Sequence, residues 1–376
     1  MSSINGSRLR LSIFGESHGP GIGCVLDGLP AGEAFDLEEI GVQMARRAPG
    51  RDATATRRSE SDTPRLLSGF LEKDGHTRTT GAPLAMLIEN ENQRSGDYRE
   101  LEILPRPGHA DYPAHVRYHG FQDVRGGGHF SGRLTAPLVF AGALCKQMLR
   151  RRGVAVGGHI AAIGGVEDRR FDPLAVSAEE LEALSRIPFS LLDPAVEPFM
   201  RAAVETARME ADSVGGIVEA AAVGLPAGIG SPMFDGVENR LAALMFGIPA
   251  VKGLEFGDGF ALAAMRGSEA NDPYRYTHDG GVETTSNHNG GLLGGITNGM
   301  PLILRAVVKP TSSIGIPQHT VNLETGRDDT LTVRGRHDPC IVPRALPVVE
   351  AALAFGLFDL LLEAEGNSSP RAGFRL

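Results

Sequence analysis

Cysteine is scarce in this chain, and its few cysteines lie far apart. The 376 residues include 3 cysteines, at Cys24, Cys145 and Cys340, and no Cys-x-x-Cys pair occurs. An odd number at such wide spacing argues against a disulfide framework and a zinc site, and it is typical of a reducing compartment. We therefore expect a cytoplasmic protein.

Several motifs that define common binding sites are also absent. No Gly-x-Gly-x-x-Gly follows a strand-like run, and neither a Gly-x-x-x-x-Gly-Lys-Ser/Thr loop nor a His-Glu-x-x-His pair occurs. The sequence therefore favours neither a Rossmann nor a Walker nucleotide site. The 11 histidines do not cluster at zinc-ligand spacing, so no metal is expected.

Membrane and nucleic-acid partners are not expected either. Residues 1–8 lack an apolar signal region, and no run of about 18 apolar residues indicates a membrane span. The net charge of −9 argues against general affinity for nucleic acids.

Lysine is nearly missing, whereas arginine and glycine are plentiful. Of the 37 basic residues, 4 are lysines and 33 are arginines, whose planar fork suits carboxylate and phosphate. A GC-rich genome would also favour arginine, but many arginines lie in loops rich in Gly and Pro. The 49 glycines gather in clusters such as 126–128 and 290–295, where backbone could approach a ligand or simply form turns.

Hydrophobic patterns and capping signals predict an α+β fold. Strands are expected at 9–14, 23–29, 82–89, 214–223 and 302–308. Asp36 with Glu39 indicates a capping box that opens a helix to about Arg47, and further helices are expected at 135–152, from Ser177, from Asp193 with Pro194, at 235–245 and at 346–363. Residues 90–133 are expected to form a long functional loop.

A short internal repeat indicates two related halves. The segment Gly28-Leu-Pro-Ala-Gly32 recurs at 224–228, and each copy follows a strand-like run and precedes a helix. A five-residue match could arise by chance or from turn chemistry, but the shared context favours a pseudo-repeat. We therefore expect one domain over 1–376, with halves roughly at 1–150 and 210–376.

Two loops place histidines among polar residues. His18 lies in Gly15-Glu-Ser-His-Gly19, where an imidazole could exchange a proton near neutral pH or simply tie the loop together. In Arg106-Pro-Gly-His109-Ala-Asp111, the carboxylate could orient the histidine, or the group could be a surface salt bridge.

Further loops indicate anion binding. Residues 125–133 combine Arg, three glycines, Ser131 and Arg133 before a predicted helix, which is typical of an anion site. Lys309 is followed by three hydroxyl residues within 311–313, Ser286 begins a loop that could lie against a flat ring, and 336–338 again joins Arg, His and Asp. Together they predict a pocket for a small metabolite with carboxylates and phosphate.

In this order, the segments resemble the chorismate synthase family. The resemblance runs from residue 9 to about residue 365 and rests on the motifs FGESHG, DGLPAG, IENENQRS, RPGHADY, RGGG, VKGLEFG, SNHNGG, KPTSS and GRHDPC. It implies a β-α-β sandwich assembled as a homotetramer. It also implies 1,4-anti elimination of phosphate from 5-enolpyruvylshikimate 3-phosphate, with reduced FMN and no net redox change. NADPH would serve only to regenerate the flavin, through a separate flavin reductase.

The resemblance also assigns roles to residues. His18 would protonate the departing phosphate, His109 would lie beside the flavin, and Asp338 would help relay the substrate's C6 proton. The residues implied to bind substrate are Arg47, Arg106, Ser131, Arg133 and Arg336. Those implied to bind flavin are His129, Phe130, Ser131, Ala250, Gly294, Lys309, Pro310, Thr311, Ser312, Ser313 and Arg336.

The chain departs from the family at a few of these positions. His129-Phe130 stands where Arg-Ser is common, so ring packing could replace part of the flavin contact. Pro249 stands where Asn is common, and Ala53 where Arg is common, with Arg51 as a possible substitute at an NADPH contact. The alternatives are an NADPH-dependent flavin oxidoreductase and a catalytically silent anion-binding protein. The complete set of His18, His109 and Asp338 argues against the silent protein.

Overall fold

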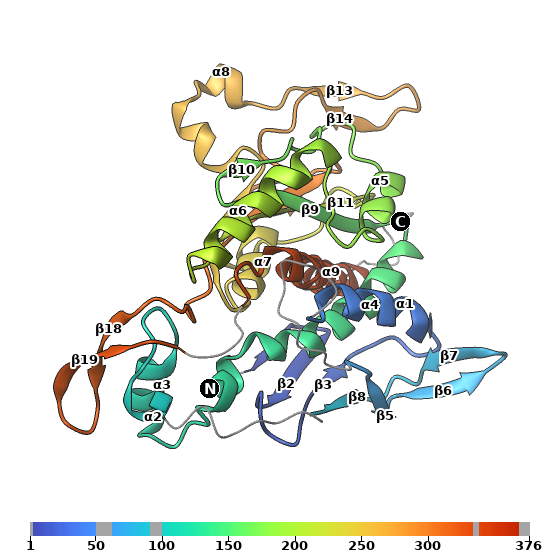
Figure 1. The fold of residues 1–376 in the computed structure, drawn as a ribbon. Helices are drawn as coiled ribbons and strands as arrows, with labels where there is room; N and C mark the ends of the chain where they lie inside the picture. Colours follow the sequence, from blue (N-terminus) through green and yellow to red (C-terminus); the bar gives the residue numbers. More distant parts are fainter. Residues whose placement is uncertain (1–2, 50–61, 91–99, 334–337, 368–376) are drawn as a thin grey trace.

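Two antiparallel five-stranded sheets enclose a layer of helices (Figure 1). The computed structural model describes residues 3–49, 62–90, 100–333 and 338–367. The first sheet has the order β1 (Ile4–Asn5), β2 (Arg10–Gly15), β3 (Gly21–Asp27), β8 (Leu84–Glu89), β5 (Arg65–Ser68). The second has the order β10 (Val166–Glu167), β9 (Ala155–Ile163), β11 (Gly216–Val223), β17 (Leu302–Val308), β12 (Val251–Phe256).

Four helices form the middle layer, and shorter elements surround the sandwich. The middle helices are α1 (Leu37–Arg47), α4 (Thr135–Arg150), α7 (Val237–Met245) and α9 (Val342–Asn367). The other helices are α2 (Glu100–Ile103), α3 (Asp111–Tyr118), α5 (Ala178–Leu184), α6 (Glu197–Met209) and α8 (Gly267–Ala270). The remaining strands are β4 (Ala34–Phe35), β6 (Phe70–Lys73), β7 (His76–Thr79), β13 (Tyr274–Tyr276), β14 (Val282–Thr284), β15 (Leu292–Leu293), β16 (Ile296–Thr297), β18 (Gln318–Asn322) and β19 (Arg327–Leu331).

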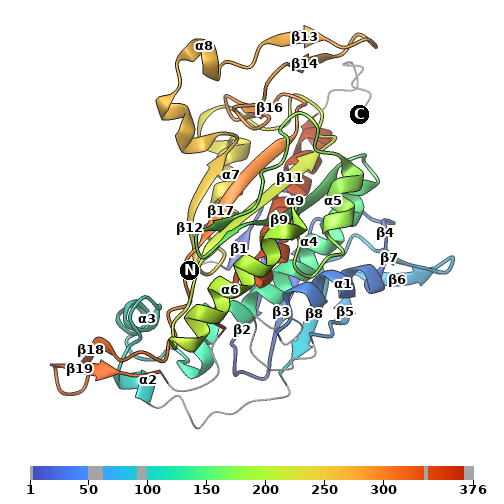
Figure 2. The same ribbon diagram turned by 45° about the horizontal axis from the view of Figure 1, so that its top comes forward.

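Helices cover both faces of the second sheet. A side chain at Gly157 of β9 would meet Leu181 of α5, whereas one at Gly158 would meet Leu346 of α9. Successive residues of a strand point to opposite faces, so α5 and α9 lie on opposite sides of this sheet. Figure 2 shows α6 on the same outer side as α5.

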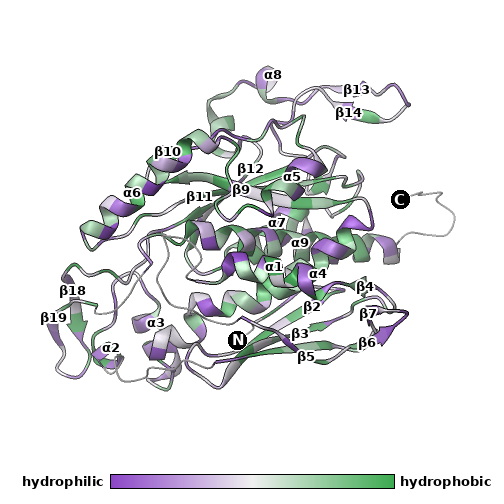
Figure 3. Ribbon diagram, turned by 45° about the vertical axis from the view of Figure 1, so that its right-hand side comes forward, coloured by the Kyte–Doolittle hydropathy of each residue, from purple (hydrophilic) through white to green (hydrophobic). Residues whose placement is uncertain are grey.

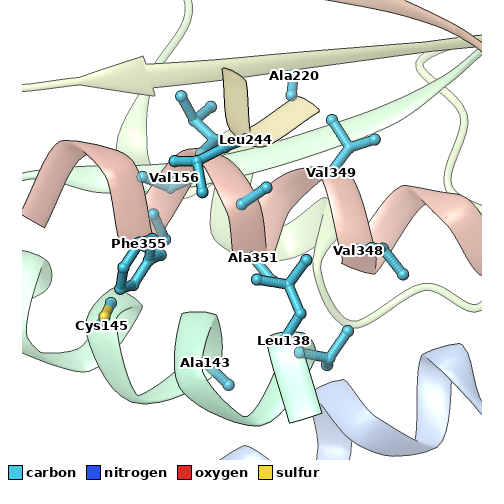
Figure 4. Close-up of a cluster of buried hydrophobic side chains, with 14 of the residues drawn as sticks. Leu138, Ala143, Cys145, Val156, Ala220, Leu244, Val348, Val349, Ala351 and Phe355 are labelled. Atoms are coloured by element: carbon cyan, nitrogen blue, oxygen red, sulfur yellow. The ribbon is translucent and has the colours of Figure 1, made fainter. Parts of the chain in front are cut away.

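One hydrophobic core joins the two sheets and the middle helices. Figure 3 shows hydrophobic residues in the strands and central helices and hydrophilic ones in the hairpins at the rim. Helix α9 alone, within the described ranges, is long and apolar enough to cross a membrane, yet 94% of its apolar window is buried inside the fold. It is therefore the central core helix, and Figure 4 shows its Phe355 and Ala351 facing α4.

Helices α4 and α9 approach each other closely at Gly142. A β-carbon there would lie 2.3 Å from the Cα of Ala351. Gly356 similarly faces α7, because its β-carbon would lie 2.7 Å from Leu241 Cδ2. Glycine lets two backbones touch at Gly142 and leaves room for the Leu241 side chain at Gly356, so packing is close where three helices meet.

Ion pairs fix the position of α1 against α9. The buried Glu350 accepts hydrogen bonds from Arg46 Nη1 at 2.9 Å and Lys146 Nζ at 2.7 Å. Burial alone would raise the pKa of Glu350, but these two cations outweigh it and lower the pKa to about 2. The ion pair between Arg46 and Glu350 therefore holds the end of α1, where the next residue, Arg47, is predicted to bind the substrate.

The two copies of the Gly-Leu-Pro-Ala-Gly turn make matching hydrogen bonds. Thr79 Oγ1 donates to Pro30 O at 2.6 Å, and Thr297 Oγ1 donates to Pro226 O at 2.7 Å. The N–H groups of Gly32 and Gly228 donate to the carbonyls of these same threonines, each at 2.8 Å. Together with the matching order of the strands in the two sheets, these bonds support the pseudo-repeat. The division of the chain into two halves stays a prediction. The second sheet, however, reaches back to β9, before residue 210.

Several predicted elements differ in extent or type. The predicted loop 90–133 contains α3, whose Pro113 falls in the first helical turn, where proline is tolerated. Asp36 caps α1, but Glu39 pairs with Arg150 instead of completing a capping box. The helix predicted from Asp193 begins as a 3₁₀ turn, Pro194–Val196, and continues as α6. Helix α9 begins at Val342, before the expected residue 346.

Gly142→Val should destabilise the fold by about 3 kcal/mol, because a branched side chain must separate α4 from α9. Gly41→Ala in α1 is the matched control. Its β-carbon would meet nothing within 4 Å, so it should stabilise the protein by about 0.5–1 kcal/mol. Denaturant unfolding measures both. Equal stability of Gly142→Val and the wild type would contradict the close contact.

Candidate active site

Two predicted catalytic histidines meet at the triple-glycine segment Gly126–Gly128. Ser17 N donates to Gly128 O at 3.1 Å, which places the His18 loop over this segment. A β-carbon on Gly126 would lie 2.2 Å from His18 Nδ1, and one on Gly127 would lie 3.2 Å from His109 Nε2. All three glycines have positive φ, between 53° and 83°. The bare backbone therefore brings both imidazoles to one place.

His109 belongs to a buried network with Arg106 and Asp111. Its Nδ1 lies 2.5 Å from Asp111 Oδ1, while Arg106 donates through Nε at 2.7 Å and Nη2 at 2.9 Å to the two oxygens of Asp111. Burial would raise the pKa of Asp111, but hydrogen bonds from Arg106 and then His109 outweigh it and hold the pKa well below its usual range. The charged carboxylate therefore fixes the orientation of the imidazole.

The segment Lys309–Ser313 lies beside this network. Arg106 Nη1 donates to Ser313 Oγ at 3.1 Å, and a β-carbon on Gly108 would lie 3.6 Å from Lys309 Nζ. Burial lowers the pKa of Lys309, and the positive charge of Lys252 lowers it further. Thr311 Oγ1 is buried and has no hydrogen-bond partner among the described residues, so this strip presents polar groups to a ligand.

Arg47 and Arg133 converge on one carboxylate, Asp62. Arg47 Nη2 donates to Asp62 Oδ2 at 2.7 Å, and Arg133 Nη1 donates to Asp62 Oδ1. The side chains of Arg47 and Arg133 are only 2% and 6% exposed, and that of Asp62 is 3% exposed. Burial of this extent makes the neutralising carboxylate necessary for the two cations.

The third predicted catalytic residue, Asp338, is held by the first turn of α9. Arg344 Nη1 donates to Asp338 Oδ2, and Arg344 Nε donates to the carbonyl oxygen of Arg47 at 2.9 Å. The guanidinium of Arg344 therefore joins Asp338, the predicted proton relay, to the end of α1, where Arg47 is predicted to bind the substrate.

The side chains of residues 129–131 make contacts within the chain. His129 Nε2 lies 2.6 Å from Ser3 Oγ, and its Nδ1 lies 2.8 Å from Gly15 O. The ring of Phe130 packs against Tyr118, with centroids 6.2 Å apart. Ser131 Oγ accepts from Arg133 N at 3.3 Å, so this hydroxyl caps the turn that leads into α4.

The remaining flavin-binding candidates fall into two groups. Ala250, which follows the exposed Pro249, lies next to Lys309, whose N–H donates to Ala250 O at 2.9 Å. Gly294 lies between β15 and β16, which precede the start of β17, whereas Lys309 follows the end of that strand. Within one chain, Gly294 is therefore at the opposite end of the second sheet. Arg336, Arg51 and Ala53 lie outside the described residues.

The SNHNGG motif also lies away from the place where His18 and His109 meet. Asn287 Nδ2 donates to Pro301 O at 2.9 Å, just before β17 begins, and His288 Nδ1 lies 2.6 Å from Asp258 Oδ2. Gly257, beside Asp258, follows the last residue of β12. In one chain, this loop therefore shapes the end of the second sheet that carries Gly294.

Sequence reasoning missed three residues that organise the site: Asp62, Asn90 and Arg344. Asn90 accepts from Arg133 Nε at 3.1 Å and donates to the carbonyls of Glu16 and Gly19 at 3.1 and 2.9 Å. It therefore ties the arginine pair to the His18 loop. Asn90 falls within a recognised motif, but the contact of Arg344 with the Arg47 carbonyl and that of Asp62 with Arg133 gave no local signal, because they join residues 297 and 71 positions apart.

The fold and these contacts define an α+β protein in which buried or half-buried histidines, arginines and carboxylates are joined by hydrogen bonds and ion pairs. Within the described ranges, no group of three or more His, Cys, Asp or Glu side chains is placed to hold a metal ion.

A family model for chorismate synthase matches residues 9–362. The chain is 48% identical over 359 residues to a chorismate synthase of Thermococcus kodakarensis, covering 96% of this chain and 97% of the relative. It is 44% identical over 364 residues to one from Dehalococcoides mccartyi, covering 97% and 98%. A crystal structure of a chorismate synthase superposes with a TM-score of 0.74 at 29% identity, covering 96% of this chain and 94% of that chain. The chain therefore belongs to the chorismate synthase family, an enzyme family of lyases, and has its fold.

Asp111→Asn should lower the free energy of unfolding at pH 7 by about 3 kcal/mol, because Arg106 loses a buried anionic partner. The folded pKa of Asp111 is depressed, so this stabilisation is present above the unfolded value of about 3.9 and is lost as pH falls through the folded value. The difference from wild type should therefore shrink below about pH 4. Denaturant unfolding across this range measures it.

Glu205→Gln is the matched control, because its pair with Arg208 is exposed on α6 and should add little stability. If the free energies of unfolding of Asp111→Asn and the wild type differed by the same amount from neutral to acidic pH, Asp111 would not be the charged partner of Arg106.

Proposed function

We propose that this protein converts 5-enolpyruvylshikimate 3-phosphate to chorismate and inorganic phosphate by 1,4-anti elimination, with reduced FMN as cofactor. The observation that carries the proposal is the meeting of His18 and His109 at the Gly126–Gly128 backbone, beside buried arginines. A substrate with two carboxylates and a phosphate needs several guanidinium donors, and an elimination needs groups that give and take protons.

The residues around Lys309 suit a flavin. Thr311 offers a buried hydroxyl with no partner in the described part of the chain, and Lys309 offers a partly desolvated ammonium. Lys309–Ser313 and Ala250 would hold the cofactor, with Phe130 supplying ring packing. The chemistry that reduced FMN supplies when bound is a temporary loan of electron density, which leaves no net redox change.

The chain's own residues then bind the substrate and handle its protons. Arg47, Arg106 and Arg133 hold the anionic groups, and burial of these side chains strengthens each charge-assisted hydrogen bond. As the bond between C3 and the phosphate oxygen breaks, His18 donates a proton to that oxygen. Asp338, oriented by Arg344, helps to carry away the proton that leaves C6. The buried position of His18 keeps water from this transfer.

We also propose a cytoplasmic homotetramer that receives reduced FMN from a separate flavin reductase, so that NADPH is consumed only by the reductase. The position of Gly294 supports an assembly of several chains. If Gly294 contacts flavin, it does so in the pocket of another copy, because in its own chain it lies at the far end of β17 from Lys309.

The proposed activity is tested anaerobically with enolpyruvylshikimate phosphate and dithionite-reduced FMN. Chorismate absorbance and released phosphate should rise together in equal amounts. Failure to form chorismate under these conditions would overturn the proposal. Aerobic oxidation of NADPH without added reductase would instead support the flavin oxidoreductase.

His109→Ala should slow turnover by about 10²-fold or more, because proton handling by a positioned side chain contributes on this scale. His76→Ala is the control, since His76 is exposed on strand β7 and should leave turnover unchanged. Near-normal turnover of His109→Ala would remove His109 from the mechanism.

A further inference from the structure

The carboxylate of Asp62 occupies the arginine pair on which the proposed function depends. It accepts from Arg47 Nη2 at 2.7 Å and from Arg133 Nη1, one bond through each oxygen. These are the bonds that a carboxylate or phosphate of the substrate would make with the same guanidinium groups. Asp62 is therefore an anion of the protein's own chain that makes the hydrogen bonds expected of the ligand.

Both arginines also donate hydrogen bonds to described parts of the protein outside Asp62. Arg47 Nη1 donates to Gly132 O at 3.3 Å and to Thr135 Oγ1 at 3.5 Å, at the start of α4. Arg133 Nε donates to Asn90 Oδ1 at 3.1 Å. A ligand oxygen that replaced Asp62 would leave these bonds intact, so the guanidinium groups would keep their orientation.

Asp62 is held differently from Asp111, another carboxylate of the site. Asp111 accepts from the backbone N–H of Arg106 at 3.0 Å and lies 2.5 Å from His109, besides its two bonds from the Arg106 side chain. Among the described residues, only the guanidinium groups of Arg47 and Arg133 donate hydrogen bonds to Asp62. Asp111 is therefore built into the fold, whereas Asp62 depends on the ligand-binding cations themselves.

We propose that Asp62 is an internal anion that occupies Arg47 and Arg133 in the ligand-free protein and is displaced by an anionic group of the substrate. The proposal rests on the proposed function in so far as these arginines bind substrate. Asp62 gives both buried cations an anionic partner until the ligand arrives, which spares them the cost of a buried charge without such a partner. In return, the apparent affinity for the ligand is lower, because only the molecules in which Asp62 does not hold the two arginines can bind it.

The test is calorimetric titration of inorganic phosphate into the flavin-free protein at constant ionic strength. Asp62→Asn keeps the shape of the side chain and removes its charge, so it should bind phosphate about tenfold more tightly or better. Glu182→Gln is the matched control, because it removes a carboxylate from an exposed pair with Arg186, and it should stay within about twofold of the wild type. Asp62→Glu, which keeps the charge, should bind no more tightly than the wild type.

Weaker or unchanged phosphate binding by Asp62→Asn would overturn the proposal and would make Asp62 a permanent positioning residue. If Asp62→Asn is less stable, the thermal midpoint gives a second readout. Phosphate should raise the midpoint of the variant by more than it raises that of the wild type, and a smaller rise would also overturn the proposal. The titration needs no turnover, so a wild-type protein that forms no chorismate would refute the proposed function without changing this result.

Discussion

The candidate site depends on three successive glycines that replace side chains with bare backbone. Gly126 lies against the ring of His18 and Gly127 against that of His109, although the two histidines are 91 positions apart in the chain. Any β-carbon at Gly126 would overlap the His18 ring, so this close approach of His18 requires glycine at position 126. The glycines of the RGGG motif thus have a specific steric role, which is to leave space for two side chains that are predicted to handle protons.

Charge pairing is the second constraint, because Arg47, Arg106 and Arg133 are buried. Arg46 and Glu350 fix the end of α1, Arg344 joins that end to Asp338, and Arg106 is fixed by its own carboxylate partner. Each pair avoids the large cost of an unneutralised desolvated charge. The same pairing holds the guanidinium groups in place before a ligand binds, so little side-chain entropy is lost on binding. Preorganisation of this kind would suit the multiply charged substrate that we propose, around which water must be excluded.

Local signals in the sequence predicted the parts of the fold that are set by neighbours in the chain. The caps at Asp36 and Ser177, the repeated turn and strands β2, β3, β8, β11 and β17 all follow from periodicity and short motifs. Strand β9 was missed because Gly157 and Gly158 break the β-branched pattern, and each leaves room for a backbone or a helix beside it. The pairing of Asp62 with two arginines joins residues far apart in sequence, so it becomes visible only once the fold has brought them together.

Anaerobic chorismate formation by Gly126→Ala tests this account most directly. The added methyl group must displace His18 from His109, so the rate should fall by about 10²-fold or more while the protein stays folded. Gly132→Ala is the neighbouring control, because its β-carbon would meet nothing within 4 Å, and it should keep nearly the wild-type rate. A near-normal rate for Gly126→Ala would contradict the claim that the glycine backbone assembles the catalytic pair.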